Sequence, residues 1–301
     1  MKRFIVMWAL SACVVASPAA ADPWKASVDA NLTLTQNAYS DNWVGGEVGS
    51  LAWALNSNSF AERQFNPKLN NKTSLKLFFG QAHNQDKETK TWEKPVKSTD
   101  RIDLETVFRF TLGGFVDPYA SGRFESQFLD ASDPDNERLV NPMLFTESFG
   151  IAKVLTKVDK REWSVRLGGA FRQSYDRDIR DTTSPCCTGP EVAKRDLSTN
   201  DGGLLFVSDF TTPLSENKIT ITSKLSVYKA FFYSEKDKLA GLPNADDWKA
   251  PDVNWESMMT AGITKYLMVN LYVQFLYDKE VSLAGRLKQT LSLGLTYKWS
   301  R

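Results

Sequence analysis

The sequence predicts an all-β protein, an antiparallel transmembrane β-barrel of about twelve strands and of the outer-membrane type. Apolar and polar residues alternate along most of the chain, which is the period of strands and not of helices. Beyond Val15, no apolar run approaches the roughly 18 residues that a membrane helix needs. The C-terminal segment also alternates, and it ends on aromatic residues. Together these features indicate strands that present every second side chain to lipid.

The N-terminus is typical of a secretory signal peptide. Lys2 and Arg3 precede an apolar run over 4–15, and Ala19-Ala20-Ala21 supplies small residues for cleavage. This divides the chain into a signal peptide at 1–21 and a barrel at 22–301. The segment ending at Cys13 also fits a lipoprotein cleavage box. We favour the ordinary signal, because the apolar run continues past Cys13 and no polar tether follows.

The strands follow in order along the chain. In the clearest segment Ile102, Leu104 and Phe108 fall on one face, and Arg101 and Asp103 fall on the other. A wet interior behind a lipid-facing surface requires such a strand, whereas a soluble β-sandwich does not. The same alternation predicts strands at 25–36, 47–56, 71–81, 100–112, 119–129, 144–155, 163–173, 203–211, 218–232, 253–265, 268–277 and 286–299.

The connections fall into short inner turns and long outer loops, as in outer-membrane barrels. This assignment places both termini in the periplasm. The segment 57–70 is expected to be a long connection that folds back as a plug or a small helix. The predicted strands do not alternate perfectly between inner turns and outer loops, so at least one miscounted strand is expected. Inner turns are predicted at 113–118, 156–161, 212–217 and 266–267, and outer loops at 82–99, 130–143, 174–202 and 233–252.

Charged residues occupy many inward positions of these strands. One interpretation is a pore lining that selects among permeant ions. The other is a mutually neutralising network that fills a small barrel and fixes strand register. Mixed signs favour the second, and a network that leaves a gap is still a pore. The candidate lumen-lining residues are Arg101, Asp103, Glu105, Arg109, Arg123, Glu125, Arg166, Arg172 and Lys224.

Other chemistry has little support. Lys and Arg total 37 and Asp and Glu total 36, so nucleic acid is not an expected partner. The single histidine, His83, is placed in a loop with no serine beside it, so we expect no catalytic site, metal or cofactor. Cys186 and Cys187 are expected as an oxidised or inert loop pair. Four acidic residues are expected to be solvated, with a divalent-cation site as the alternative: Asp130, Asp133, Asp135 and Glu137.

Aromatic residues near strand ends, including Tyr119 and Trp163, are expected to form girdles at the membrane surfaces. The C-terminal segment combines polar and small residues with two aromatic residues. It resembles the recognition signal read by the bacterial barrel-assembly machinery. The expected partners are therefore that machinery, outer-membrane lipid and small polar solutes. The signal residues are Ser292, Gly294, Tyr297 and Trp299.

Three blocks of sequence also resemble one bacterial family, the domain of unknown function 3078. They are the segment 34–47 with its Asn42-Trp43 and Gly45-Gly46-Glu47, the segment 97–104, and the segment 253–278. The resemblance implies an outer-membrane barrel without an assigned activity. It therefore supplies no functional residues that could be carried over to this chain.

The leading functional hypothesis is a small passive pore or transporter for polar solutes in the outer membrane. The alternative is a closed structural or surface-binding barrel that acts through the outer loops 82–99, 174–202 and 233–252. A lipid-modifying enzyme is the least favoured hypothesis, because the sequence offers no credible nucleophile and base. We therefore expect no enzymatic activity.

Overall fold

The computed structural model describes residues 23–39, 48–133, 136–180, 194–215 and 218–300. All but one of the elements are strands, and the exception is a short 3-10 helix, η1. The elements are β1 (Lys25–Asn37), β2 (Ser50–Asn66), β3 (Leu69–Asn84), β4 (Val96–Phe110), β5 (Asp117–Ser126), β6 (Leu129–Asp130), β7 (Arg138–Leu139), β8 (Met143–Val158), β9 (Arg161–Arg180), β10 (Lys194–Leu214), β11 (Ile219–Tyr233), η1 (Asp247–Lys249), β12 (Pro251–Gly262), β13 (Leu267–Tyr277) and β14 (Arg286–Ser300).

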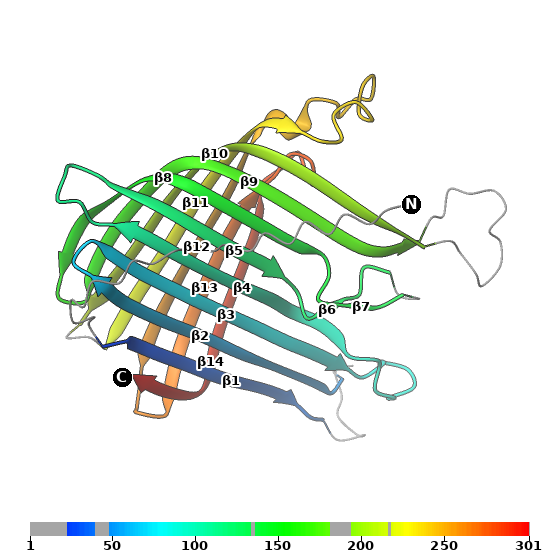
Figure 1. Ribbon diagram of the computed structural model, residues 1–301. Coiled ribbons are helices and arrows are strands. Elements are labelled where there is room, and N and C mark those ends of the chain that lie inside the picture. Colours follow the sequence, from blue (N-terminus) through cyan, green and yellow to red (C-terminus); the bar gives the residue numbers. More distant parts are fainter. Residues whose placement is uncertain (1–22, 40–47, 134–135, 181–193, 216–217, 301) are drawn as a thin grey trace.

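Twelve of these strands form a closed antiparallel barrel (Figure 1). Neighbours in the chain are neighbours in the sheet, except that β5 pairs with β8 across the small β6–β7 hairpin. The barrel closes where β1 pairs with β14, from Ser27 opposite Ser300 to Thr33 opposite Gly294. The predicted fold class and the predicted number of strands are confirmed.

Alternation separates the two surfaces of every barrel strand. On β14 the outward residues Leu287, Leu291 and Leu295 are 69%, 69% and 64% exposed. Their neighbours in the strand turn inward, where Thr296 is buried. A closed barrel satisfies all its ladder hydrogen bonds internally, so this apolar outer surface suits the bilayer. The chain is thus a barrel of the outer-membrane type. Within the described residues, no helix is long and apolar enough to cross a membrane.

One predicted girdle residue faces the other way. Tyr119 pairs with Arg109 and Gly150 at inward positions, and it is 3% exposed. Its ring therefore fills the interior, while Trp163 faces outward and is 42% exposed, as predicted. Tyr119 was predicted as a girdle residue only because it is aromatic and lies near a strand end. The alternation along β5 places its side chain on the interior face of the strand instead.

The connections divide cleanly between the two ends of the barrel (Figure 1). We call the end with the short connections the turn end and the other the loop end. β1 begins and β14 ends at the turn end. The turn-end connections are 67–68, 111–116, 159–160, 215–218 and 263–266, and the loop-end connections are 38–49, 85–95, 127–142, 181–193, 234–250 and 278–285.

The prediction for 57–70 is wrong. β2 continues to Asn66, and a turn over Pro67 and Lys68 leads directly into β3. The Asn66 side chain accepts a hydrogen bond of 2.9 Å from the backbone N–H of Lys68, which stabilises this tight turn. No plug or helix lies there. The barrel has the predicted twelve strands, so the expected miscount is also wrong.

β9 and β10 are the longest strands, and they extend past their neighbours at the loop end. β9 runs to Arg180 and β10 starts at Lys194, so much of the predicted loop 174–202 is strand. The β6–β7 connection lies against the extension of β9 (Figure 1). Arg138 forms an ion pair of 3.1 Å with Asp176 there. This end of the barrel thus carries a structure built from 127–133, 136–142 and β9.

Candidate functional site

The inward positions of the barrel strands carry a network of charged side chains near the middle of the lumen. We call it the central network. Its members come from seven strands, β3, β4, β5 and β9 to β12, and five are acidic and five basic. They are Lys76, Arg101, Asp103, Glu105, Arg123, Glu125, Arg166, Asp209, Lys224 and Glu256.

Asp103, at the middle of β4, is the centre of one half of this network. Arg101 Nη2 donates a hydrogen bond of 2.7 Å to its Oδ2, and Arg123 donates to both carboxylate oxygens at 2.9 and 3.0 Å. Glu125 lies opposite Asp103 in the register and forms an ion pair of 2.9 Å with Arg123. Two guanidinium groups therefore hold a carboxylate that is only 3% exposed.

Glu256 of β12 links this group to the opposite wall of the barrel. Its Oε1 lies 2.7 Å from Arg101 Nη1, and its Oε2 accepts a hydrogen bond of 3.1 Å from Lys76 Nζ. In the closed strand order, β4 and β12 are separated by several strands in either direction. Side chains of these strands can meet only through the interior, so these contacts cross the lumen.

Glu105 is the centre of the other half. Arg166 Nη2 of β9 donates to Glu105 Oε1 at 2.8 Å and also lies 3.2 Å from Asp209 Oδ2. Lys224 of β11 donates to the second oxygen of Glu105. In the strand order β4 and β11 are separated by four strands on one side and six on the other, so the Lys224 contact also crosses the lumen, whereas only β5 and β8 separate β4 from β9. The central network is electrically balanced and joins both walls.

The nine predicted residues all lie at inward positions. Seven of them belong to the central network, and Arg172 and Arg109 lie nearer the two ends. Arg172 donates to Asp201 at 2.8 Å and to Asp252 at 2.7 Å, and its guanidinium lies 3.7 Å from the centre of the Tyr228 ring. Arg109 lies at the turn end, with Nε 3.8 Å from Asp117 Oδ2. That these residues line a pore stays a prediction.

Several members of these groups were missed from the sequence. Lys76, Asp209 and Glu256 complete the central network, and Asp201 and Asp252 bind Arg172. Lys76 lies between Leu75 and Leu77, so the strand period was a usable signal there. Phe210 and Trp255 give a weaker signal for Asp209 and Glu256. For Asp201 it was hidden, because β10 begins nine residues before the predicted strand at 203 and its register shifts between Gly202 and Gly203.

The acidic loop residues are bound to arginines. Arg138 lies 2.6 Å from Asp130, and Arg180 binds Asp133. Burial of Asp130 opposes its ionisation, but hydrogen bonds from Asn141 and Ser132 and the charge of Arg138 hold the pKa of Asp130 below its ordinary value. The prediction that these two residues are solvated is wrong. Among the described residues no group of acidic side chains could hold a metal ion, and Asp135 lies outside the described residues.

His83 is part of a strand and not of a loop, contrary to the prediction. It lies one residue before the end of β3 and pairs with Leu51 of β2. In the part of the chain that the structure describes, its imidazole forms no hydrogen bond with a serine or threonine hydroxyl. Cys13, Cys186, Cys187 and the signal segment lie outside the described residues.

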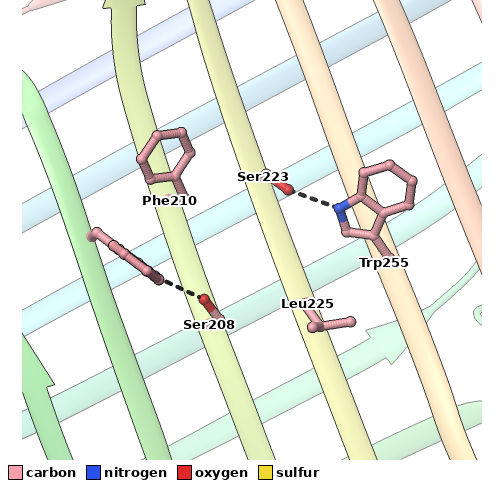
Figure 2. Close-up of a pocket in the computed structure, with 6 residues that line it drawn as sticks. Ser208, Phe210, Ser223, Leu225 and Trp255 are labelled. Atoms are coloured by element: carbon pink, nitrogen blue, oxygen red, sulfur yellow. Dashed lines mark hydrogen bonds between the residues drawn. The ribbon is translucent and has the colours of Figure 1, made fainter. Parts of the chain in front are cut away.

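The outer surface carries an apolar groove of about 610 Å³ over β9 to β12 (Figure 2). Two tryptophans border it, and their indole N–H groups are satisfied by serines of the neighbouring strand. Trp255 donates to Ser223 at 2.9 Å and Trp163 to Ser208 at 3.1 Å. Phe210 and Leu225 complete the lining. With no polar donor left free, these side chains present an apolar surface to the bilayer.

The sequence matches the model of one protein family. Residues 34–131 match the model of a family described as "Protein of unknown function (DUF3078)". The resemblance noted in the sequence is thereby confirmed. The match includes β2 to β5 and the central residues Asp103 and Glu105 of the network. The block at 253–278 lies outside the matched residues. No curated protein matches the sequence significantly.

Solved structures with a similar arrangement are outer-membrane proteins. The COG4313 outer membrane channel from Pseudomonas putida F1 is 13% identical, with 95% of this chain and 97% of that chain covered and a TM-score of 0.38. The translocator domain of the autotransporter NalP from Neisseria meningitidis is 9% identical, with 92% and 87% covered and a TM-score of 0.36. These proteins are too distant from the chain to indicate its function.

Proposed function

We propose that the chain is a narrow outer-membrane channel for small polar solutes, with the central network as its constriction. The observation that supports this is a charged group that crosses the lumen at mid-height and still meets water in part. Asp103 and Glu256 are 3% and 5% exposed, whereas the Glu125 side chain is 25% exposed. Solutes and ions then pass along the side of the central network on which Glu125 is partly exposed.

The cost of burying charge supports the same proposal. A buried ion pair contributes little net stability, and apolar residues of similar volume often stabilise a protein equally well. A barrel that serves only as a membrane anchor has no need of ten charged side chains in its interior. A polar, electrically balanced constriction admits small hydrated solutes of either sign and excludes larger or apolar ones. We place the loop end outside the cell and both termini in the periplasm.

The test is single-channel conductance of the refolded chain in a planar bilayer. Arg101→Ala combined with Glu256→Ala removes the contacts that Glu256 makes across the lumen with Arg101 and Lys76, without changing the net charge, and we expect a larger conductance than for the wild type. Glu235→Ala combined with Lys238→Ala removes an ion pair from the loop-end connection 234–250 and serves as the matched control. That control should leave the conductance unchanged.

A barrel that folds but carries no current, in the wild type and in the Arg101→Ala/Glu256→Ala variant alike, would contradict the channel. The second candidate, a surface-binding barrel, would then be favoured. The ordered loop end supports that candidate: Asn141 is fully buried there and donates to Asp130 at 2.9 Å and to Asp176 at 2.7 Å.

A further inference from the structure

A cavity of about 130 Å³ lies at the turn end of the barrel. We infer that it is a binding site for one small inorganic oxyanion such as phosphate. The cavity is bordered by the start of β1, the β2–β3 hairpin, the last residues of β4 and those of β8. Its lining residues are Pro23, Lys25, Glu62, Arg63, Gln64, Asn70, Arg109 and Lys157.

The charge of this cavity is unlike that of the central network. The lining holds four cationic residues and one carboxylate, Glu62. Arg63 faces outward by the alternation of β2, and its guanidinium lies 5.5 Å from the centre of the Trp24 ring. Lys25, Arg109 and Lys157 occupy inward positions on three different strands. Glu162 and Asp117 lie just outside the lining, 3.8 Å from Lys157 and from Arg109, but within the lining itself the cationic residues outnumber the one carboxylate.

Within the described residues, Arg109 Nε and Lys157 Nζ lie beyond hydrogen-bond distance of the nearest carboxylates. Arg109 Nε is buried and has no hydrogen-bond acceptor within the described residues, since the nearest Asp117 oxygen is 3.8 Å away. Lys157 Nζ lies 3.6 Å from Glu62 and 3.8 Å from Glu162, beyond good hydrogen-bond distance. In the central network, by contrast, the arginines donate to carboxylates at 2.7 to 3.0 Å.

A buried donor without an acceptor costs free energy, and an oxyanion would supply the missing acceptors. Glu62 accepts a hydrogen bond of 3.1 Å from Asn70 and lies 3.6 Å from Lys157 Nζ, and it does not supply the acceptor that Arg109 Nε lacks. The cavity, at about 130 Å³, has room for one tetrahedral or planar oxyanion.

This site goes beyond the proposed channel, because its occupancy can be measured without any current. The experiment is isothermal titration of inorganic phosphate into the full chain, refolded in detergent, at constant ionic strength. We expect saturable binding of one phosphate per barrel. Arg109→Gln should weaken it about tenfold or more, the effect of losing one charge-assisted hydrogen bond.

The matched control is Lys160→Gln, which removes a positive charge from the exposed turn 159–160 at the same end of the barrel. It should leave the affinity unchanged. If Arg109→Gln loses the gel mobility of a folded barrel, Lys157→Gln replaces it, because that side chain is half exposed. Absence of saturable binding, or equal weakening by Lys160→Gln, would overturn the inference. Conductance of the same samples shows separately whether the channel proposal stands.

Discussion

Glu147 is the residue whose position is hardest to reconcile with a lipid-facing surface. It is exposed at an outward position of β8, between Phe145 and Phe149, which are 40% and 72% exposed. Gly122 and Phe171 lie opposite it on the neighbouring strands. Its carboxylate accepts only a long hydrogen bond, 3.4 Å, from Gln173. A carboxylate in such a row costs free energy, because the bilayer solvates charge poorly.

Replacing this residue should therefore stabilise the barrel. We expect Glu147→Leu to raise the free energy of unfolding in lipid bilayers by about 1–2 kcal/mol, less than the gain from removing an outward arginine. Urea titration followed by tryptophan fluorescence measures it. Glu88→Leu, in the exposed connection 85–95, is the control and should change little. A loss of stability in Glu147→Leu would show that the carboxylate has a partner in the membrane.

Predictions of the direction in which single side chains point were confirmed where they depended on the period of two along a strand alone. Arg101, Asp103 and Glu105 were predicted to face inward, and they do. Their partners Glu256 and Lys224 lie more than a hundred residues later in the chain. No local pattern connects them, because the pairing depends on which strands oppose each other across the closed barrel.

At the scale of elements, the contact between β8 and β9 is set by two glycines that face each other across the ladder. Gly150 pairs with Gly168. A Cβ on Gly168 would lie 2.2 Å from the carbonyl oxygen of Phe149 and 2.8 Å from the hydroxyl of Tyr119. The buried Tyr119 of β5 thus lies close to backbone that carries no side chain. These strands can approach each other only because both positions are glycine.

We therefore expect Gly168→Ala to lower the free energy of unfolding by about 1–3 kcal/mol, the usual cost of overpacking. Gly122→Ala is the matched control, because a Cβ there meets no atom within 4 Å. That change should be neutral or slightly stabilising. Urea unfolding of both variants in the same bilayer compares them. Equal effects would mean that the β8–β9 approach has no special requirement for glycine.

The error at 57–70 also belongs to this scale. Asn56, Asn58 and Glu62 continue the inward row of β2, but their outward partners Ser57, Ser59 and Ala61 are small or polar. The apolar half of the alternation is therefore weak, and the segment was not predicted as strand. Its pairing with β1 as far as Glu62 and with β3 as far as Asn66 overrides that weak local pattern.

At the scale of the whole molecule, closure depends on β14. Seven residue pairs join β1 to β14, from Ser27–Ser300 to Thr33–Gly294, whereas thirteen join β1 to β2. Asn31 and Thr296 face each other in this short seam, and their buried side-chain polar atoms have no hydrogen-bond partner within the described residues. The seam is therefore the contact we expect to form last and open first.

The outward aromatic residues of β14 lie beside this seam, with Tyr297 65% and Trp299 43% exposed. That they form a signal for the assembly machinery is still a prediction. We expect Tyr297→Ala combined with Trp299→Ala to reduce the amount of assembled barrel in cells several-fold, while the purified chain still refolds in detergent. Heat-modifiable mobility on gels measures both quantities.

Leu287→Ala combined with Leu291→Ala removes similar apolar area from the same face of β14, outside the signal residues, and is the control. It should assemble in cells nearly as well as the wild type. If both double variants assemble equally poorly, the effect belongs to lipid contact, and the signal hypothesis fails.

The sequence by itself determined the number of strands, the face on which most of their side chains lie and the alternation of the C-terminal strand. All three depend on the period of two along a strand, which is a local property. Only the tertiary structure decided that Glu256 meets Arg101, that Arg166 meets Glu105, and that Lys25, Arg109 and Lys157 converge at one mouth. The reason is geometric. Contacts across the interior depend on strand order, stagger and closure, and these arise only when all twelve strands are assembled.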